Sequence, residues 1–436
     1  MTAPDDGSRR GAVRPSDLVI LVAGLAMAVL VRLILLPATG LRSDLDIFTT
    51  WVHWIATGPF GQAYRIDVAF PPVMVYLFWL LGIVEPAFRT ATDAADPTIR
   101  IALKIPAVLA DAGLAAGVAF LLRDRPRWAI AAALGILLSP VFIYTGAWWG
   151  QFESIYILAG LAAAILVLGG RPYLGAVALG VALMAKPQAI AFIPPFAAWA
   201  VARLGWRRAL TVGAVFALTV AVLWLPFLAD GGPAAYLRTL TRHQTEIFAI
   251  LSLRAWNPWW ALQTAAAGDG FLSDGGAILG PLSPRLIGFV LAGVLELFIV
   301  AAVYRAPTRR GLLLGLSASV LVLFCCLTSV HERYAEAALV FLAPLLPDRR
   351  VLATWLGLTG LMTLNLLAAV PPSPEVGTLV PIGGALGLLG SLAMTGLTAF
   401  VLWLLVHGST IPDGADGQYV RAMASPDPVG ASSAGS

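Results

Sequence analysis

Long apolar runs separated by short polar connections make up most of the chain. The runs that we expect to enter or cross a membrane cover residues 16–36, 101–122, 128–147, 153–169, 172–185, 188–202, 208–228, 285–303, 311–329, 335–346, 351–369 and 379–406. A helix needs about 20 residues to cross a bilayer, so several of these runs are too short to cross upright. The pattern predicts an all-α polytopic membrane protein with about 11–13 transmembrane helices in one domain over 16–406.

Arginines gather in alternate connections between these runs. They lie in the N-terminal segment and at or near 123–127, 171, 203–208, 305–310 and 349–350. Cytoplasmic connections are enriched in arginine and lysine, so we expect these segments on the cytoplasmic side. The external side then carries two larger loops, over about 37–70 and 229–284, with helices that lie in the interface.

The apolar run 71–84 leaves two topologies open. If this short run does not cross the membrane, all the arginine clusters fall on one side, and we favour that topology. If it crosses, the charge pattern breaks downstream. The polar ends of the chain, 1–15 and 407–436, are predicted to be disordered, with the N-terminal one in the cytoplasm.

The composition excludes a soluble protein. Hydrophobic residues make up 59% of the 436 and charged residues 12%, compared with about 25% charged in soluble domains. The basic residues mark connections rather than one face, so we expect no nucleic-acid partner. Cys325 and Cys326 are adjacent in an apolar run, which argues against a disulfide framework or a metal site. The abundance of Ala, Gly, Leu and Arg, with only two lysines, is typical of a GC-rich bacterium and hence predicts the plasma membrane.

Two carboxylates, Asp44 and Asp46, directly follow the first apolar run. Such a pair could supply a general base, or bind a cation or a substrate hydroxyl. The alternative is local, because Ser43 or Asp44 could cap an interfacial helix over 45–57. Both interpretations can hold at once.

Two polar turns interrupt the apolar runs in the first half of the chain. Gln151 and Glu153 offer an amide and a carboxylate that suit sugar hydroxyls, unless Glu153 only caps the next helix. Lys186 and Gln188 flank a proline that breaks a helix. The lysine could hold a phosphate or extend toward the membrane surface.

His331, Glu332 and Arg333 stand together at the end of another apolar run. Three ionisable groups at such a place are costly, which favours a function over a solvated turn. Arg333 could pair with a phosphate, and His331 could donate to a leaving phosphate oxygen. In the second external loop Asn257 lies among tryptophans, which suits either a sugar or an interfacial aromatic belt.

Lys104 and Asp111 lie seven residues apart, and therefore on one face of the helix expected over 101–122. They could form an intramembrane pair or each meet another partner. The chain shows no clean internal repeat, which weighs modestly against a transporter, because transporters are often built from repeats.

Taken in order, these motifs resemble the GT-C superfamily of membrane glycosyltransferases that use polyprenyl-phosphate sugars. Within it, the chain is similar to the dolichyl-phosphate-glucose-dependent glucosyltransferases and to bacterial proteins related to GPI-anchor mannosyltransferases. The motifs are SDLD (43–46), DVAFPP (67–72), WGQFE (149–153), AKPQ (185–188), WNPW (256–259) and VHERY (330–334). Two departures stand out: Glu153 replaces an aspartate that is frequent in bacterial relatives, and the external loops are shorter than in the eukaryotic enzymes.

The resemblance implies an inverting glycosyltransferase with a GT-C-like helical bundle. It would move a hexose, mannose or glucose, from a polyprenyl-phosphate donor to a lipid-linked or cell-envelope glycan acceptor at the external membrane face. It implies that Asp44 is the catalytic base and that His331 contacts the donor phosphate. We expect the remaining substrate contacts from Asp46, Gln151, Glu153, Lys186, Gln188, Asn257, Glu332 and Arg333.

No cofactor is expected. Some members of the superfamily use a divalent metal, but Asp44 and Asp46 alone do not make a convincing metal site, so we predict metal independence. A transporter or flippase of a lipid-linked saccharide is the alternative function, since it also needs intramembrane charges and broken helices. It does not predict a single acidic base in the first external loop. A non-catalytic membrane subunit is a third alternative.

Overall fold

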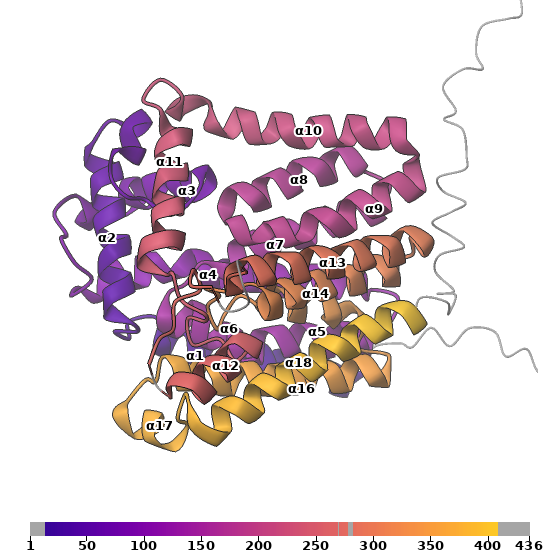
Figure 1. Cartoon of the computed structure of the whole chain (residues 1–436). Coiled ribbons are helices and arrows are strands. Elements are labelled where there is room, and N and C mark those ends of the chain that lie inside the picture. Colours follow the sequence, from indigo (N-terminus) through magenta and orange to yellow (C-terminus); the bar gives the residue numbers. More distant parts are fainter. Residues whose placement is uncertain (1–13, 269, 278–281, 409–436) are drawn as a thin grey trace, which may run out of the picture.

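The computed structural model describes residues 14–268, 270–277 and 282–408, which form a bundle of helices (Figure 1). The disorder predicted for 1–13 and 409–436 lies outside the described residues. The longest helices are α1 (Pro15–Leu35), α4 (Pro97–Leu121), α10 (Trp206–Trp224), α13 (Pro284–Arg305), α14 (Arg309–Cys326), α16 (Arg349–Ala369) and α18 (Gly384–His407).

Shorter helices complete the bundle and its loops. They are α2 (Arg42–Thr57), α3 (Pro72–Val84), α5 (Pro126–Leu138), α6 (Pro140–Phe142), α7 (Glu153–Leu168), α8 (Pro172–Ala185), α9 (Ile193–Leu204), α11 (Gly232–Arg242), α12 (Pro258–Ala267), α15 (Glu336–Leu342) and α17 (Pro374–Leu379). Five segments are 3-10 helices: η1 (Phe60–Arg65), η2 (Pro86–Arg89), η4 (Pro187–Phe192), η5 (Leu225–Phe227) and η7 (Ala343–Leu345). Two are π helices: η3 (Ile143–Trp149) and η6 (His243–Ile247).

Among the described residues, eight helical segments are long and apolar enough to cross a membrane. Four shorter apolar helices add to them: α3, α7, α8 and the segment Glu336–Leu345. The predicted fold class, an all-α polytopic membrane protein, is therefore confirmed. Proline occupies the first turn of many helices, including α1, α3, α4, α5, α8 and α13. Its fixed φ suits that position, where the missing N–H would have no helical partner.

The bundle has two chemically different ends. α2, α3, α11 and α17 gather at one of them, which we call the loop end (Figure 1). The connections that hold 123–127, 171, 203–208, 305–310 and 349–350 lie at the other, which we call the arginine end. α3 covers 13 residues, about 20 Å, and packs most extensively against α2. Its place among the loop-end elements favours the topology in which 71–84 does not cross.

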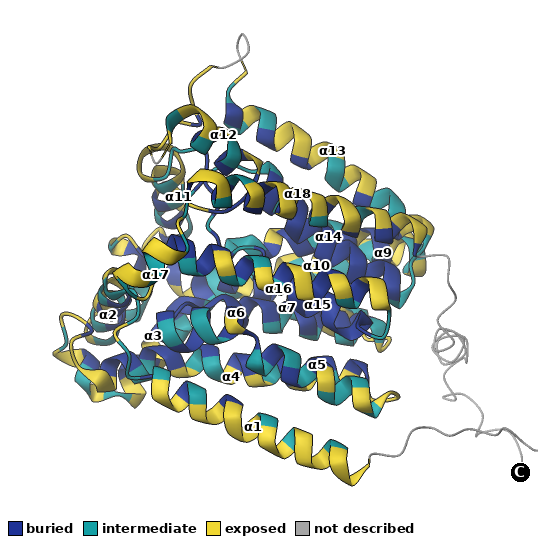
Figure 2. Ribbon diagram, turned by 90° about the horizontal axis from the view of Figure 1, so that it is seen from below, coloured by how far each residue is buried: buried dark blue, intermediate teal, exposed yellow. Residues whose placement is uncertain are grey.

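The centre of the bundle is tightly packed, whereas the outer helices present apolar side chains to their surroundings. α14 and α15 are buried, and α1 and α13 carry long exposed faces (Figure 2). No residue of α10 is buried. Exposed leucines, isoleucines and valines on α1 and α13 suit contact with lipid hydrocarbon rather than with water.

Three central helices are shorter than a bilayer is thick. α7 has 16 residues and α8 has 14, while α4 has 25 and α18 has 24. At 1.5 Å per residue, α8 covers about 21 Å and the segment Glu336–Leu345 about 15 Å, against about 30 Å for a hydrocarbon core. Their connections at the loop end therefore lie below the rim that the longer helices form.

A buried ion pair holds α1 to the bundle. Arg32 Nη2 lies 2.9 Å from Asp111 Oδ2, and Ser154 donates to Asp111 Oδ1 at 2.6 Å. Lys104 does not join this pair; its Nζ donates to the carbonyl of Ala38 at 2.7 Å. Of the two alternatives for Lys104 and Asp111, the structure supports separate partners.

Replacing Asp111 by alanine leaves Arg32 buried without a counter-charge. Removing one partner of a buried pair costs about 3–5 kcal/mol, so we expect a large drop in the thermal unfolding midpoint in detergent. The control is Ser391→Ala, which removes a buried hydroxyl bonded to its own helix at Gly387 and should cost about 0.5–1.5 kcal/mol. Equal midpoints for the two variants would contradict the assignment.

Candidate active site

Asp44 lies inside the first turn of α2 and does not cap it. α2 begins at Arg42, and no side chain caps it, so the capping role considered for Ser43 or Asp44 is wrong. The Asp44 carboxylate turns instead toward the connection before α7. Its Oδ2 accepts hydrogen bonds from Gln151 Nε2 at 2.6 Å and from Trp149 Nε1 at 3.0 Å. Both donors bind Oδ2, and no described residue donates to Oδ1.

The turn that carries these donors requires glycine. Gly150 follows η3 with a φ of 91°, a left-handed conformation. A β-carbon here would come within 2.7 Å of Leu45 on α2. The absence of a side chain at Gly150 thus allows the turn to approach α2 and brings Gln151 to Asp44.

Glu153 binds two cations at once. Its Oε1 contacts Lys186 Nζ, and it lies 2.8 Å from Arg333 Nε. Glu153 is 1% exposed, Lys186 5% and Arg333 8%, so these charges are almost wholly removed from solvent and must be paired. The three residues come from the start of α7, the break between α8 and η4, and the connection between α14 and α15. Three distant parts of the chain therefore meet at one recessed cluster, which we call the ion-pair cluster.

Arg333 connects the ion-pair cluster to Asp44. Its Nη1 donates to Glu332 at 3.1 Å, and its guanidinium lies 4.8 Å from the centre of the Trp149 ring. Trp149 thus contacts Arg333 with its face and Asp44 with its indole N–H. The second terminal nitrogen of Arg333, Nη2, bonds to no described residue and remains available as a donor.

His331 lies beside Arg333, half-buried between two aromatic rings. The ring centres of Phe248 and Tyr334 are 5.6 Å and 5.3 Å from that of His331. Its Nδ1 is 3.8 Å from Glu332 Oε2. Burial, and then the charge of Arg333, lower the pKa of His331, so the imidazole is neutral at neutral pH and can donate one N–H.

A cavity of about 60 Å³ adjoins the ion-pair cluster. Tyr156, Gln188 and Tyr334 line it together with apolar residues of α14, Ala191 of η4 and Val330. The Lys186 ammonium lies 5.8 Å from the centre of the Tyr334 ring. Gln188 is therefore close to the other predicted residues.

Asp46 and Asn257 bond elsewhere. Asp46 Oδ1 accepts from Arg42 at 2.6 Å and from the backbone N–H of Ala94 at 2.7 Å. Asn257 caps α12 by accepting from the N–H of Trp260 at 3.0 Å, and it donates to the carbonyl of Phe324 at 2.9 Å. Local structure accounts for both side chains, and their substrate roles stay predictions.

Two polar contacts were not foreseen from the sequence. Trp149 has the composition of a membrane-interface anchor, yet it bonds to Asp44. Glu296 on α13 accepts from Ser319 at 2.6 Å, and its Oε2 has no partner. As the only carboxylate in the run 285–303, Glu296 carried the sequence signal of an intramembrane acid.

The fold and the recessed cluster define an integral, multi-pass membrane protein with a polar site between its helices. The sequence profile of glycosyltransferase family 87 matches residues 69–330, more than half of the chain. The chain therefore belongs to glycosyltransferase family 87 and is a membrane glycosyltransferase. No curated protein matches it.

The family match agrees with the resemblance to GT-C-type enzymes. It includes Gln151, Glu153 and Lys186 but begins after Asp44 and ends one residue before His331. Roles for these last two residues therefore depend on the geometry of the site.

The shared carboxylate predicts strong coupling between Glu153 and Lys186. Glu153→Gln leaves two buried cations with too little counter-charge and should cost about 3–5 kcal/mol of unfolding free energy. Lys186→Met relieves part of that excess, so the double variant should be more stable than the sum of the single effects by about 0.5–3 kcal/mol. Thermal unfolding of the three purified variants measures this coupling. Simple additivity would mean that the two residues do not share a buried pair.

Proposed function

We propose that this glycosyltransferase moves a hexose from a polyprenyl-phosphate donor to a lipid-linked or cell-envelope glycan at the external face of a bacterial plasma membrane. Transfer proceeds with inversion at the anomeric carbon. The loop end is the external end, since the arginine end carries the short, arginine-rich connections typical of the cytoplasm.

The observation that carries this proposal is the geometry of Asp44. Trp149 and Gln151 hold Oδ2, which fixes the carboxylate, while Oδ1 stays open. Oδ1 takes the proton of the acceptor hydroxyl as its oxygen attacks the anomeric carbon. The bond between that carbon and the phosphate oxygen breaks, and the electron pair leaves with the lipid phosphate.

The leaving phosphate needs positive charge and N–H donors on the side opposite the base. Arg333 Nη2 is an open donor on a residue whose charge interacts with that of Asp44. His331 adds a neutral N–H, and Lys186 is the second cation of the ion-pair cluster. The donor is a phosphate diester, and the departing polyprenyl phosphate is a good leaving group when positive charge stabilises it, so a second catalytic acid is unnecessary.

The remaining polar groups suit the sugar. Gln151 keeps one amide hydrogen and its carbonyl oxygen beyond the bond to Asp44, and Glu153 Oε2 is buried without a partner. Glu332 and Gln188 flank the same cluster. These residues bind and orient the hexose in the proposal, whereas Asp46 and Asn257 stay outside it.

A transporter or flippase is less well supported by the packing. α14 and α15 close the side of the cluster that faces the arginine end. Leu339, Phe341 and Leu342 of α15 are fully buried. A transport path would have to open through this densely packed centre.

Asp44→Asn tests the proposed base. The amide keeps the shape of the side chain but cannot take a proton, so transfer from polyprenyl-phosphate mannose or glucose should fall about 100- to 10,000-fold. Asp93→Asn is the matched control, because Asp93 is a half-exposed carboxylate before α4 that pairs with Arg42 and accepts the N–H of Ala95. Transfer is measured with purified protein, and a near-normal rate for Asp44→Asn would refute the assignment.

Labelling tests the proposed side of the membrane. In a variant with Cys325 and Cys326 replaced by alanine, we expect Ser43→Cys to react with a membrane-impermeant maleimide on intact cells. Asp124→Cys, in the exposed connection between α4 and α5, should react only after permeabilisation. The reverse pattern would place the site on the cytoplasmic face.

A further inference from the structure

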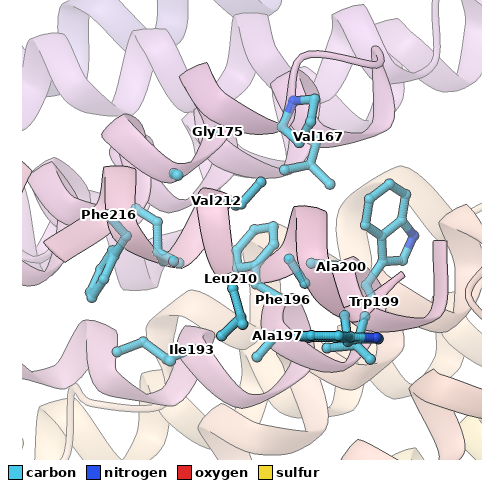
Figure 3. Close-up of a pocket in the computed structure, with 17 residues that line it drawn as sticks. Val167, Gly175, Ile193, Phe196, Ala197, Trp199, Ala200, Leu210, Val212 and Phe216 are labelled. Carbon is cyan, nitrogen blue, oxygen red and sulfur yellow. The ribbon is translucent and has the colours of Figure 1, made fainter. Parts of the chain in front are cut away.

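An apolar cavity lies between α7, α8, α9 and α10, away from the ion-pair cluster (Figure 3). Its volume of about 360 Å³ falls within the range of about 300–1,000 Å³ that is typical of ligand pockets. Side chains of all four helices converge on it, among them Val167, Leu179, Phe196, Trp199, Leu210 and Phe216. A cavity lined in this way excludes water and suits a hydrocarbon chain.

The packing of α10 leaves this cavity open. No residue of α10 is buried, and a β-carbon at Gly213, which lines the cavity, would meet nothing within 4 Å. Trp206 and Leu210 line the cavity and are 62% and 65% exposed. The cavity is thus accessible from the hydrocarbon around the bundle and does not belong to the closed core.

Arginines without acidic partners surround the arginine end of the same cavity. Arg171 precedes α8, Arg203 lies in the last turn of α9, and Arg207 and Arg208 lie in the first turn of α10. All four are exposed, and none forms an ion pair within the described chain. By contrast, at the same end of the bundle, the Arg127 and Arg310 side chains are paired with carboxylates.

Two tryptophans connect the cations to the cavity. The Arg203 guanidinium lies 5.8 Å from the centre of the Trp199 ring, and that of Arg207 lies 5.3 Å from the Trp206 ring. Trp199 and Trp206 both line the cavity. An amphiphile with an apolar chain and an anionic head would therefore find both of its parts matched at one place.

We propose that this cavity binds an anionic phospholipid of the leaflet at the arginine end. One acyl chain fills the space under α10, and the phosphate lies among Arg171, Arg203 and Arg207. Basic surfaces between transmembrane helices attract anionic headgroups, each cation contributing about fivefold in affinity. The site is separate from that of the proposed sugar donor, because the length of α8 places Arg171 roughly 20 Å from Lys186.

Filling the cavity is the first test. Gly213→Leu adds a side chain that lines the cavity, and its β-carbon meets nothing within 4 Å. Its control is Gly293→Leu on α13. A β-carbon at Gly293 also meets nothing within 4 Å, but Gly293 does not line the cavity. Native mass spectrometry of the purified full-length protein, titrated with dioleoyl phosphatidylglycerol in detergent, gives the affinity of the first bound lipid. We expect Gly213→Leu to lose it by about tenfold or more and Gly293→Leu to retain it.

Charge removal is the second test, in the same titration. The double variant Arg203→Gln/Arg207→Gln should weaken phosphatidylglycerol binding about 25-fold, at about fivefold per arginine, and leave dioleoyl phosphatidylcholine binding unchanged. Arg305→Gln is the control, because Arg305 is an exposed arginine at the same end on α13, a helix that does not line the cavity, and this variant should bind like the unaltered protein.

Three results would overturn the proposal. They are equal binding of the two phospholipids by the unaltered protein, retained binding by Gly213→Leu, and displacement of phosphatidylglycerol by an equimolar polyprenyl phosphate. The last result would assign the cavity to the tail of the sugar donor. Sugar transfer is not the readout, so failure here is independent of the proposed reaction.

Discussion

Charge that is buried below the membrane surface must be paired, and the site depends on how Glu153 meets this constraint. An ion removed from water costs several kcal/mol, even after relaxation, unless its partners compensate. Glu153 compensates both Lys186 and Arg333. A single carboxylate at the start of α7 thereby determines where the α8–η4 break and the α14–α15 connection must lie.

The position of Asp44, the proposed base, follows from the same pairing. Arg333, held by Glu153 and Glu332, lies over the face of Trp149. Trp149 then offers its indole N–H to Asp44, and Gly150 lets the turn come close enough for a second donor. Asp44 is therefore oriented by residues that the ion-pair cluster places, although it contacts none of the cluster's carboxylates. Short central helices make this possible, because they leave the cluster recessed and partly dry.

Hydropathy alone predicts most of the spans, because a helix in lipid must satisfy its own backbone and be apolar outside. The last span is an instructive error: expected from 379, it begins at Gly384, after the separate short helix α17. The residues between are apolar enough to extend a run, but Pro381 and the positive φ of Gly384 turn the chain. Hydropathy does not reveal the helices α11 and α12, which lie in a loop. α11 packs against η1 and η6, and α12 packs against α18 and α14.

The sequence predicts which residues belong to the candidate site better than it predicts which of them pair with one another. Glu153, Lys186 and Arg333 stand out because ionisable groups are rare in apolar sequence, yet spacing along the chain cannot say that 153 pairs with both 186 and 333. Asp44 and Asp46 look alike in sequence, and only the tertiary fold separates them, through α2 packing against the Gly150 turn. Asp46 turns to Arg42 and the backbone of Ala94 instead.

The cations of the ion-pair cluster and the arginines around the cavity under α10 differ in their counter-charges, and the difference follows from their exposure to water. At the ion-pair cluster each of the two cations, Lys186 and Arg333, is paired with a carboxylate. The pairing fixes the orientation of the side chains and leaves only individual N–H groups to donate to a substrate. Around the cavity under α10 the arginines are exposed, solvated and without acidic partners, so their charge stays available to any anion that reaches the surface. A site that must orient one reacting bond needs buried cations held by carboxylates. A surface that holds a headgroup of variable position needs only exposed arginines without acidic partners. The same residue type therefore suits the chemistry proposed at the ion-pair cluster and the lipid binding proposed at the cavity, according to whether its counter-charge is built into the chain.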